Sequence, residues 1–181
     1  MRIIGGQYRS RRFAVPANFK LRPTTDFAKE NLFNVLNNLI DFEETSALDL
    51  FGGTGSISFE LASRGCKEVV CVEKENAHYN FICQCAKALS APVYPLKGDA
   101  LKYLSSPNGP KFDLIFADPP YDLKELEQIP AMVFDNHRLK PDGLFILEHS
   151  SKNDFKSHPC FMQQREYGSV NFTFFRLPEQ S

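Results

Sequence analysis

The chain has 181 residues, of which 43% are hydrophobic and 24% are charged; this is the composition of an ordinary globular domain and excludes a disordered or fibrous protein. A chain of this length is expected to fold as one domain with a real core, and no apolar run is long enough to span a bilayer. The five cysteines are odd in number and form no Cys-x-x-Cys pair, so we expect buried, reduced thiols and no metal site.

The net charge is only −1, but it is unevenly distributed along the chain. All of the early basic residues precede the first acidic residue, Asp26, so the remainder is acidic. A basic arm on an acidic body is expected where one end of a protein contacts phosphates, although a solvated surface segment would give the same pattern. No secretory signal is visible, and we expect a cytoplasmic protein. The early basic residues are Arg2, Arg9, Arg11, Arg12, Lys20 and Arg22.

Apolar periodicity and turn residues divide the chain into alternating strands and helices. The expected elements are a hairpin or extended arm over 1–23, a helix over 24–40 entered at Thr24 or Thr25, a strand over 47–51, a helix over 56–64, a strand over 69–72, a helix over 76–89, strands over 93–96 and 112–117, a helix over 123–134 with a possible break at Pro130, a strand over 144–147, and two strands around Gly168-Ser169 within 161–177. This order predicts an α/β fold with a doubly wound, mainly parallel seven-stranded sheet and a C-terminal antiparallel hairpin.

A glycine-rich turn follows the first sheet strand. Its sequence is Asp-x-Phe-Gly-Gly-x-Gly from Asp49 to Gly55, and glycines let the backbone turn sharply and lie against a ligand without a Cβ in the way. The spacing differs from the dinucleotide form, and an acid at the strand end indicates a cationic or hydroxylated ligand. Such a turn can also be purely structural.

Two further strands end in residues suited to a nucleoside ligand. Glu73 follows the second strand, where a carboxylate can accept hydrogen bonds from two ribose hydroxyls. Asp99 follows the third strand and either caps the helix that begins near Ala100 or accepts a hydrogen bond from an adenine amine. These features together resemble the S-adenosylmethionine site of a class I methyltransferase, which is Rossmann-like. The residues expected to bind this cofactor are Asp49, Phe51, Gly52, Gly53, Gly55, Glu73, Lys74, Asp99 and Ala100.

The tetrapeptide Asp118-Pro119-Pro120-Tyr121 follows the strand over 112–117. Consecutive prolines fix φ and remove two backbone donors, so carbonyl acceptors are held outward. If Asp118 and the Pro119 carbonyl accept the two N–H bonds of an exocyclic amine, they direct its nitrogen toward a sulfonium methyl, while Tyr121 stacks on the base. The alternative is a structural proline turn. The tetrapeptide resembles motif IV of the amino-methyltransferases, which act on adenine N6, cytosine N4 or guanine N2.

Several stretches resemble the bacterial 16S ribosomal RNA (guanine(966)-N(2))-methyltransferase family nearly from end to end. They are Arg2-Ile-Ile-Gly-Gly, Leu21-Arg-Pro-Thr-Thr-Asp, Glu30-Asn-Leu-Phe-Asn, the glycine turn, Asp118-Pro-Pro-Tyr and Arg165-Glu-Tyr-Gly. The resemblance implies methyl transfer to guanine N2 in 16S ribosomal RNA, with Asp118, Pro119 and Tyr121 at the amine. It also implies that the arm, through Arg9, Arg11, Arg12 and Arg22, contacts RNA phosphates. Phe33 is expected in the core, and Ser10 stands where a glycine is expected.

Three other functions fit parts of the sequence less well. A DNA adenine methyltransferase needs a separate target-reading region, for which a chain of this length has little room. A 5-methylcytosine enzyme needs a nucleophilic cysteine at a strand end, whereas the only Pro-Cys pair, at Cys160, lies in a late loop. A non-catalytic RNA-binding or assembly factor would not need an intact Asp-Pro-Pro-Tyr. We therefore expect a monomeric enzyme that acts on 16S ribosomal RNA, free or within a small-subunit particle.

Overall fold

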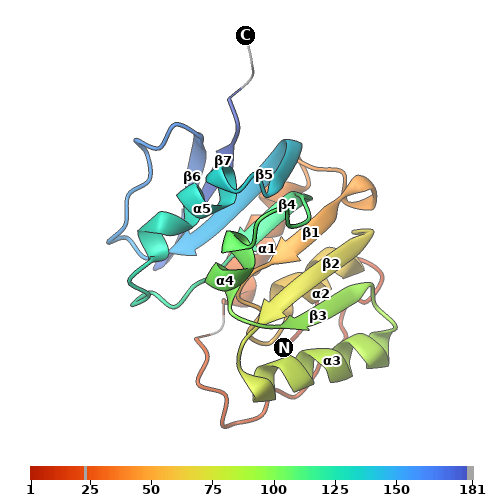
Figure 1. Cartoon of the computed structure of the whole chain (residues 1–181). Helices are drawn as coiled ribbons and strands as arrows, with labels where there is room; N and C mark the ends of the chain where they lie inside the picture. Colours follow the sequence, from red (N-terminus) through yellow and green to blue (C-terminus); the bar gives the residue numbers. More distant parts are fainter. Residues whose placement is uncertain (23, 179–181) are drawn as a thin grey trace.

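The computed structural model describes residues 1–22 and 24–178, in which seven strands form one sheet. The strand order is β3-β2-β1-β4-β5-β7-β6, with the first five strands parallel and β7 antiparallel to both of its neighbours (Figure 1). The prediction of a doubly wound sheet closed by an antiparallel hairpin is confirmed. The strands are β1 Ser46–Asp49, β2 Glu68–Glu73, β3 Val93–Lys97, β4 Phe112–Ala117, β5 Leu139–His149, β6 Phe161–Tyr167 and β7 Val170–Arg176.

Helices cover both faces of the sheet and enclose two separate apolar cores. Helices α1 Asp26–Leu36, α2 Ser56–Ser63 and α3 Asn76–Leu89 pack on one face, and α4 Ala100–Ser105 and α5 Ile129–Asp135 pack on the other (Figure 1). Single 3-10 turns, η1 Phe42–Glu44 and η2 Leu126–Gln128, precede β1 and α5. Phe33 is fully buried in the first core, as predicted. Within residues 1–22 and 24–178, no helix is both long enough and apolar enough to cross a membrane.

Three of the differences between the predicted and observed element boundaries have a clear physical cause. Helix α1 is capped by the Thr25 hydroxyl and ends at Leu36, because the chain tightens into a turn over the following asparagines instead of continuing to residue 40. Pro130 lies in the first turn of α5 and starts that helix rather than breaking one, since its missing N–H is not needed there. Strand β5 begins at Leu139, because Pro141-Asp142-Gly143 forms an irregularity within the strand instead of a turn before it.

The first 13 residues form a hairpin, where the sequence predicted a hairpin or an extended arm over residues 1–23. Arg2 and Arg12 form an antiparallel bridge, and the Ile3 amide donates to the Arg11 carbonyl at 3.0 Å. Ser10 has a left-handed φ of 69°, which is the conformation that favours the glycine expected at this position. A Cβ on Gly6 would lie 1.9 Å from the Ser63 carbonyl oxygen, so the hairpin sits directly against the end of α2.

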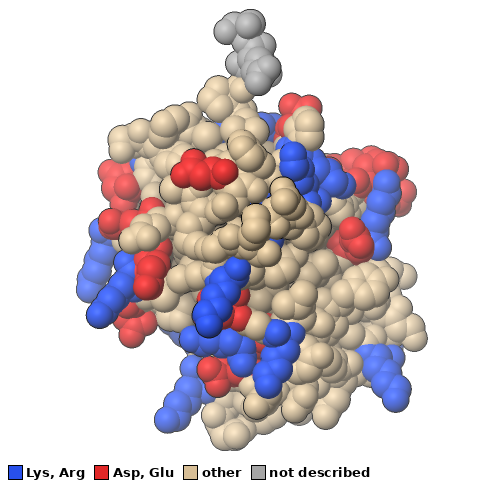
Figure 2. All heavy atoms as spheres, in the orientation of Figure 1, with Lys and Arg blue, Asp and Glu red and all other residues tan. Residues whose placement is uncertain are grey.

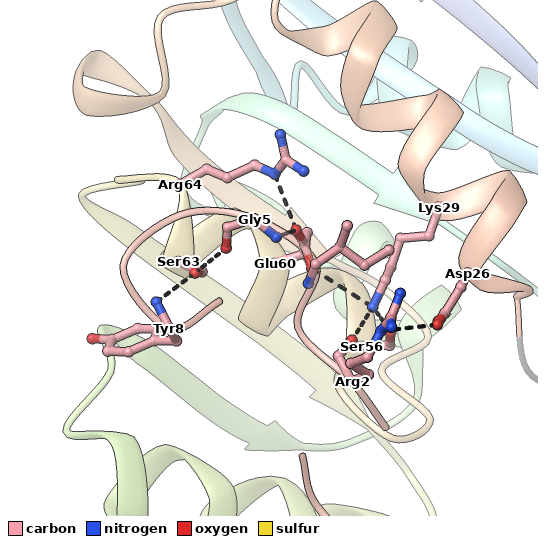
Figure 3. A network of polar contacts seen from close by, with 10 residues as sticks. Arg2, Gly5, Tyr8, Asp26, Lys29, Ser56, Glu60, Ser63 and Arg64 are labelled. Atoms are coloured by element: carbon pink, nitrogen blue, oxygen red, sulfur yellow. Dashed lines mark hydrogen bonds and ion pairs between the residues drawn. The ribbon is translucent and has the colours of Figure 1, made fainter. Parts of the chain in front are cut away.

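A buried polar cluster fixes the hairpin to the helices, and we call Lys29, Ser56, Glu60 and Ser63 the hairpin anchor (Figure 3). The Glu60 carboxylate, which has no exposed surface, accepts the backbone amides of residues 4 and 5 at 2.9 and 2.8 Å and lies 3.6 Å from the Lys29 ammonium. Lys29 also donates to Ser56 at 2.9 Å and to the backbone carbonyl of residue 2 at 2.6 Å. Arg64 completes the shell around Glu60 at 3.1 Å.

Candidate active site

Four carboxylates lie at the carboxyl ends of four adjacent strands, β2, β1, β4 and β5. They are Glu73, Asp49, Asp118 and Glu148. In each case the residue two positions earlier packs in the core beneath α1, α2 and α3, so the alternation of side chains directs all four acids to that same face. These strand ends therefore lie side by side, and Glu73 and Tyr121 lie at the same edge of the sheet.

Asp49 is 2% exposed and only half satisfied. Its Oδ2 accepts a hydrogen bond from Ser58 at 2.7 Å, while Oδ1 is buried and has no partner among the described residues. Burial is the main reason that the pKa of Asp49 is raised to about 6, and the charge of Glu73 raises it further against the lowering effect of Ser58. An acid in this state favours a donor or a cation that enters from outside.

Glu73 is tied to the glycine turn through the backbone. Its carboxylate accepts the Gly53 amide at 2.7 Å and the Glu75 amide at 2.8 Å. Carboxylate oxygens have about four lone-pair sites, so two further hydrogen bonds can be accepted. A Cβ on Gly52 would lie 2.6 Å from the Cys71 sulfur, and one on Gly55 would lie 2.7 Å from the Phe59 ring, so these two glycines are also required for packing.

The remaining residues expected at the cofactor take different positions. Asp99 caps α4 by accepting the Lys102 amide at 3.0 Å, as the structural alternative described, which leaves its second oxygen for a ligand. Ala100 is buried at the start of that helix, in the core beneath α4 and α5, and Phe51 is half-buried against that core. The Lys74 side chain is exposed. The unpartnered oxygen of Asp49 and the spare lone pairs of Glu73 fit a ligand that carries both a positive charge and ribose hydroxyls, as S-adenosylmethionine does.

The Asp-Pro-Pro-Tyr segment presents acceptors at this edge. Asp118 is half-buried, and burial first, then the nearby charge of Glu148, raises its pKa well above the usual value, while Arg22 lowers it. Among the described residues, no backbone amide donates to the Pro119 carbonyl. The Pro120 carbonyl accepts the Leu123 amide at 2.9 Å, so only the first of the two proline carbonyls has the free acceptor that the sequence predicted.

Glu148 also lies at the candidate active site, although the sequence did not lead us to predict it. It is 1% exposed, and it accepts hydrogen bonds from Thr24 at 3.0 Å and from the Tyr121 hydroxyl at 3.3 Å. The Arg22 guanidinium lies 3.7 Å from the same carboxylate. Burial raises the pKa of Glu148, and the Thr24 hydrogen bond and the Arg22 charge oppose that shift. The available signal was its position, because an acid that ends an apolar strand is the pattern that had identified Glu73.

A segment that we call the strap, residues 19–22 together with Thr24, crosses the carboxyl ends of the strands. Phe19 packs on the His78 ring of α3 at 4.3 Å between centroids, and the Leu21 side chain lies 3.6 Å from the Cβ position of Gly53. The Arg22 guanidinium carbon lies 3.5 Å from the centroid of the Tyr121 ring. Arg22 was grouped with the basic arm, and the structure places it against the candidate active site.

The other three arginines of the predicted RNA-binding set lie on the hairpin and are exposed. Arg9 and Arg12 line a pocket of about 200 Å³ together with Arg2 and Glu30. On the face shown in Figure 2, acidic and basic side chains are interspersed without a large patch of one sign. Within the part of the chain that the structure describes, no group of three or more His, Cys, Asp or Glu side chains is arranged to hold a metal ion.

Comparison with known proteins places this arrangement in a family. Residues 1–176 match the family described as Conserved hypothetical protein 95. The chain is 36% identical to the Ribosomal RNA small subunit methyltransferase D of Haemophilus influenzae over 152 residues, which are 82% of this chain and 78% of that protein. It is 31% identical to the protein of that name from Escherichia coli strain K12 over 184 residues, 99% of this chain and 91% of that protein.

A solved structure agrees with the sequence matches. A putative methyltransferase from Escherichia coli superposes with a TM-score of 0.86 at 28% identity, and the superposition covers 99% of both chains. The strand order, the glycine turn and the Asp-Pro-Pro-Tyr segment of this chain are thus accompanied by sequence identity along almost its whole length. The chain belongs to the family of the small-subunit ribosomal RNA methyltransferases D, the family that its sequence motifs resemble.

Proposed function

We propose that this protein transfers a methyl group from S-adenosylmethionine to the exocyclic N2 amine of a guanine in 16S ribosomal RNA. The observation that carries the proposal is the pair of free acceptors, the Asp118 carboxylate and the Pro119 carbonyl, at the edge where Asp49 and Glu73 offer a cofactor site. The relatives named as small-subunit ribosomal RNA methyltransferases support the choice of substrate.

The residues of this chain have three tasks in such a transfer. When bound, S-adenosylmethionine supplies an electrophilic methyl carbon, which the amine nitrogen takes while the sulfur keeps the bonding electron pair. Asp118 and the Pro119 carbonyl hold the amine by its two N–H bonds and stabilise the positive charge that develops on nitrogen. Because the pKa of Asp118 is raised, its carboxylate is also able to accept the proton that the amine must lose. Tyr121 offers a ring on which the base can stack.

The hairpin supplies contacts that do not depend on base sequence. Arg9, Arg11 and Arg12 are exposed, and the pocket between the hairpin and α1 is lined by three arginines. Guanidinium groups bind phosphate oxygens in pairs of hydrogen bonds, so this surface suits the RNA backbone. We place the protein in the cytoplasm, where ribosomes assemble, acting as a monomer on RNA that is free or within a small-subunit particle.

The decisive experiment is mass spectrometry of digested small-subunit RNA from cells that lack this protein. One N2-methylguanosine is expected to disappear and to return when the wild-type gene is restored. An unchanged content of methylguanosine, together with the loss of a different methylated base, would contradict the choice of guanine. Transfer of a labelled methyl group by the purified protein to the unmethylated RNA separates an enzyme from an assembly factor that only binds.

A further inference from the structure

Asp118 and Glu148 form a pair of neighbouring acids that the structure does not neutralise fully. The parallel register joins Ala117 of β4 to Leu147 of β5, so the next residue on each strand stands beside the other. Both side chains point to the same face of the sheet. Two adjacent carboxylates, here one buried and one half-buried, repel each other unless donors or a positive charge lie between them, so this pair requires a partner.

In the free protein, part of that requirement is met by the strap. Arg22 contacts Glu148 while its guanidinium lies on the Tyr121 ring, the surface on which a base would stack. The Arg22 side chain is half exposed, and its N–O distance to Glu148 is a long 3.7 Å. A planar group with several N–H donors thus occupies the place that a planar base with N–H donors would take.

Guanine is the base whose edge matches two neighbouring acceptors. Its N1–H and its 2-amine are adjacent donors on one edge, whereas adenine presents an N1 lone pair beside its 6-amine. We propose that Glu148 is the residue that makes the site select guanine, by accepting the N1–H while Asp118 and the Pro119 carbonyl accept the amine. An ionised Glu148 would face a lone pair on adenine and repel it. The inference rests on the proposed function, because it names how that same site identifies its base.

A purely structural role for Glu148 would lead to different results. Glu148 also holds Thr24 of the strap and the Tyr121 hydroxyl, and without those hydrogen bonds the binding of every base would weaken alike. If Glu148 selects the base through N1–H, its mutation changes the ratio between the affinities for different bases instead. Two variants separate these roles: Glu148→Gln changes the group that meets N1, and Thr24→Val removes a hydrogen bond to Glu148 but leaves its carboxylate in place.

The test uses uridine-only RNA strands that carry one central guanosine, 2-aminopurine or 2,6-diaminopurine nucleoside. Both analogues keep the 2-amine but have a lone pair at N1, and they differ from each other at position 6. Wild-type protein is expected to bind the guanosine strand about tenfold or more tightly than either analogue, which is the usual size of discrimination by a good hydrogen-bonding pair. In Glu148→Gln this ratio should fall to about one, because the amide of glutamine can donate to N1. Thr24→Val should keep the wild-type ratio.

Three outcomes would overturn the inference. The first is wild-type protein that binds the three strands equally. The second is wild-type protein that discriminates against only one of the two analogues, which would show that position 6 and not N1–H is what the site detects. The third is an equal decrease, in Thr24→Val and Glu148→Gln, of the ratio between the affinity for the guanosine strand and that for the analogue strands. This result would show that Glu148 acts only through the strap. None of these three outcomes decides whether wild-type protein methylates ribosomal RNA, so the proposed function is tested separately by the methyl-transfer assay.

Discussion

The protein contains two buried clusters of charge that differ in how completely they are paired. In the hairpin anchor, Glu60 accepts two backbone amides and faces both Lys29 and Arg64, so its lone pairs are used within the chain. At the carboxyl edge of the sheet, Asp49 has an oxygen without a partner among the described residues, and Asp118 stands beside a second acid. Burial is thus common to the two clusters, and pairing is what distinguishes them.

The contrast teaches that burial of charge alone does not identify a functional site. A buried acid whose hydrogen bonds are complete contributes to the fold, and its removal leaves the opposite charge unpaired. A buried acid that lacks partners costs stability, and such a cost persists where a ligand supplies the missing donors. The two clusters should therefore respond in opposite ways to mutation.

The largest effect is expected from Asp118→Ala. Methyl transfer to small-subunit RNA should fall by about two to four powers of ten, because the amine loses both an acceptor and a proton acceptor. Cofactor affinity, measured by calorimetry, should be unchanged, and the free energy of unfolding should not decrease. Asp122→Ala, at an exposed acid four residues on, is the control. Equal losses of cofactor affinity and methyl transfer in Asp118→Ala would refute the role assigned to this residue.

The anchor should show the opposite response. Glu60→Ala leaves two backbone amides without an acceptor and removes the carboxylate that faces the Lys29 and Arg64 cations, and the free energy of unfolding is expected to fall by about 3–5 kcal/mol. Urea denaturation measures this change. Glu44→Ala breaks an ion pair with Lys67 that is 2.7 Å long but exposed, and it should have no measurable effect. Similar stabilities for the two variants would show that the anchor is not what holds the hairpin.

Because of Asp49, the free energy of unfolding is expected to depend on pH. Its pKa is about 6 in the folded protein and about 4 in an unfolded chain, so the folded state keeps a proton that the unfolded state releases. Its contribution to stability is therefore complete below pH 4 and is lost as the pH rises through 6, by about 3 kcal/mol in total. Relative to wild type, Asp49→Asn should gain that amount between pH 4 and pH 7. Parallel pH profiles of unfolding for the two proteins would show that the Asp49 pKa is not shifted.

The exposed side of the hairpin gives a smaller effect. Replacement of Arg11 and Arg12 by alanine should weaken RNA binding and reduce the slope of log affinity against log salt by about 0.7 for each phosphate of a single strand that the protein ceases to neutralise. Cofactor affinity should stay the same. Lys67→Ala removes an exposed cation of the body and serves as the control. If the salt slope of the double variant matched that of wild type, the hairpin would not lie at the RNA interface.

The smallest effect is expected at Ser10. Its left-handed φ of 69° is easily adopted by glycine, so Ser10→Gly should stabilise the protein by about 0.5 kcal/mol. Ser10→Val should destabilise it, because a β-branched side chain is strained in this conformation. Thermal unfolding of the two variants measures the difference. A loss of stability in Ser10→Gly would mean that the serine makes an interaction that outweighs its backbone strain.

Much of the fold could be predicted from the sequence because strong local signals agreed with the tertiary structure. The helix over 76–89 and the strand over 112–117 have the predicted bounds, since apolar periodicity and the flanking residues mark both ends. The start of β5 was not predictable in this way. A Pro-Asp-Gly sequence ordinarily marks a turn, and only pairing with β4 reveals that it belongs to the strand.

Most of the residues at the candidate site follow from the residue type at a strand end, whereas the position of others depends on tertiary contacts. Strand-end position identified Asp49, Glu73 and Asp118, but it was not applied to Glu148, which follows the same rule. Arg22 could not be assigned from its charge, because its place over Tyr121 depends on the path of the strap. Lys29 lies on the apolar stripe of α1, and a charge in that stripe was the signal that a buried partner exists.

The path of the strap has a consequence for synthesis on the ribosome. Its residues are synthesised long before all of their partners, because Thr24 donates a hydrogen bond to an acid that lies 124 positions later in the chain. The candidate active site is therefore incomplete until β5 has emerged from the ribosome. We therefore expect RNA modification to begin only after β5 has been synthesised.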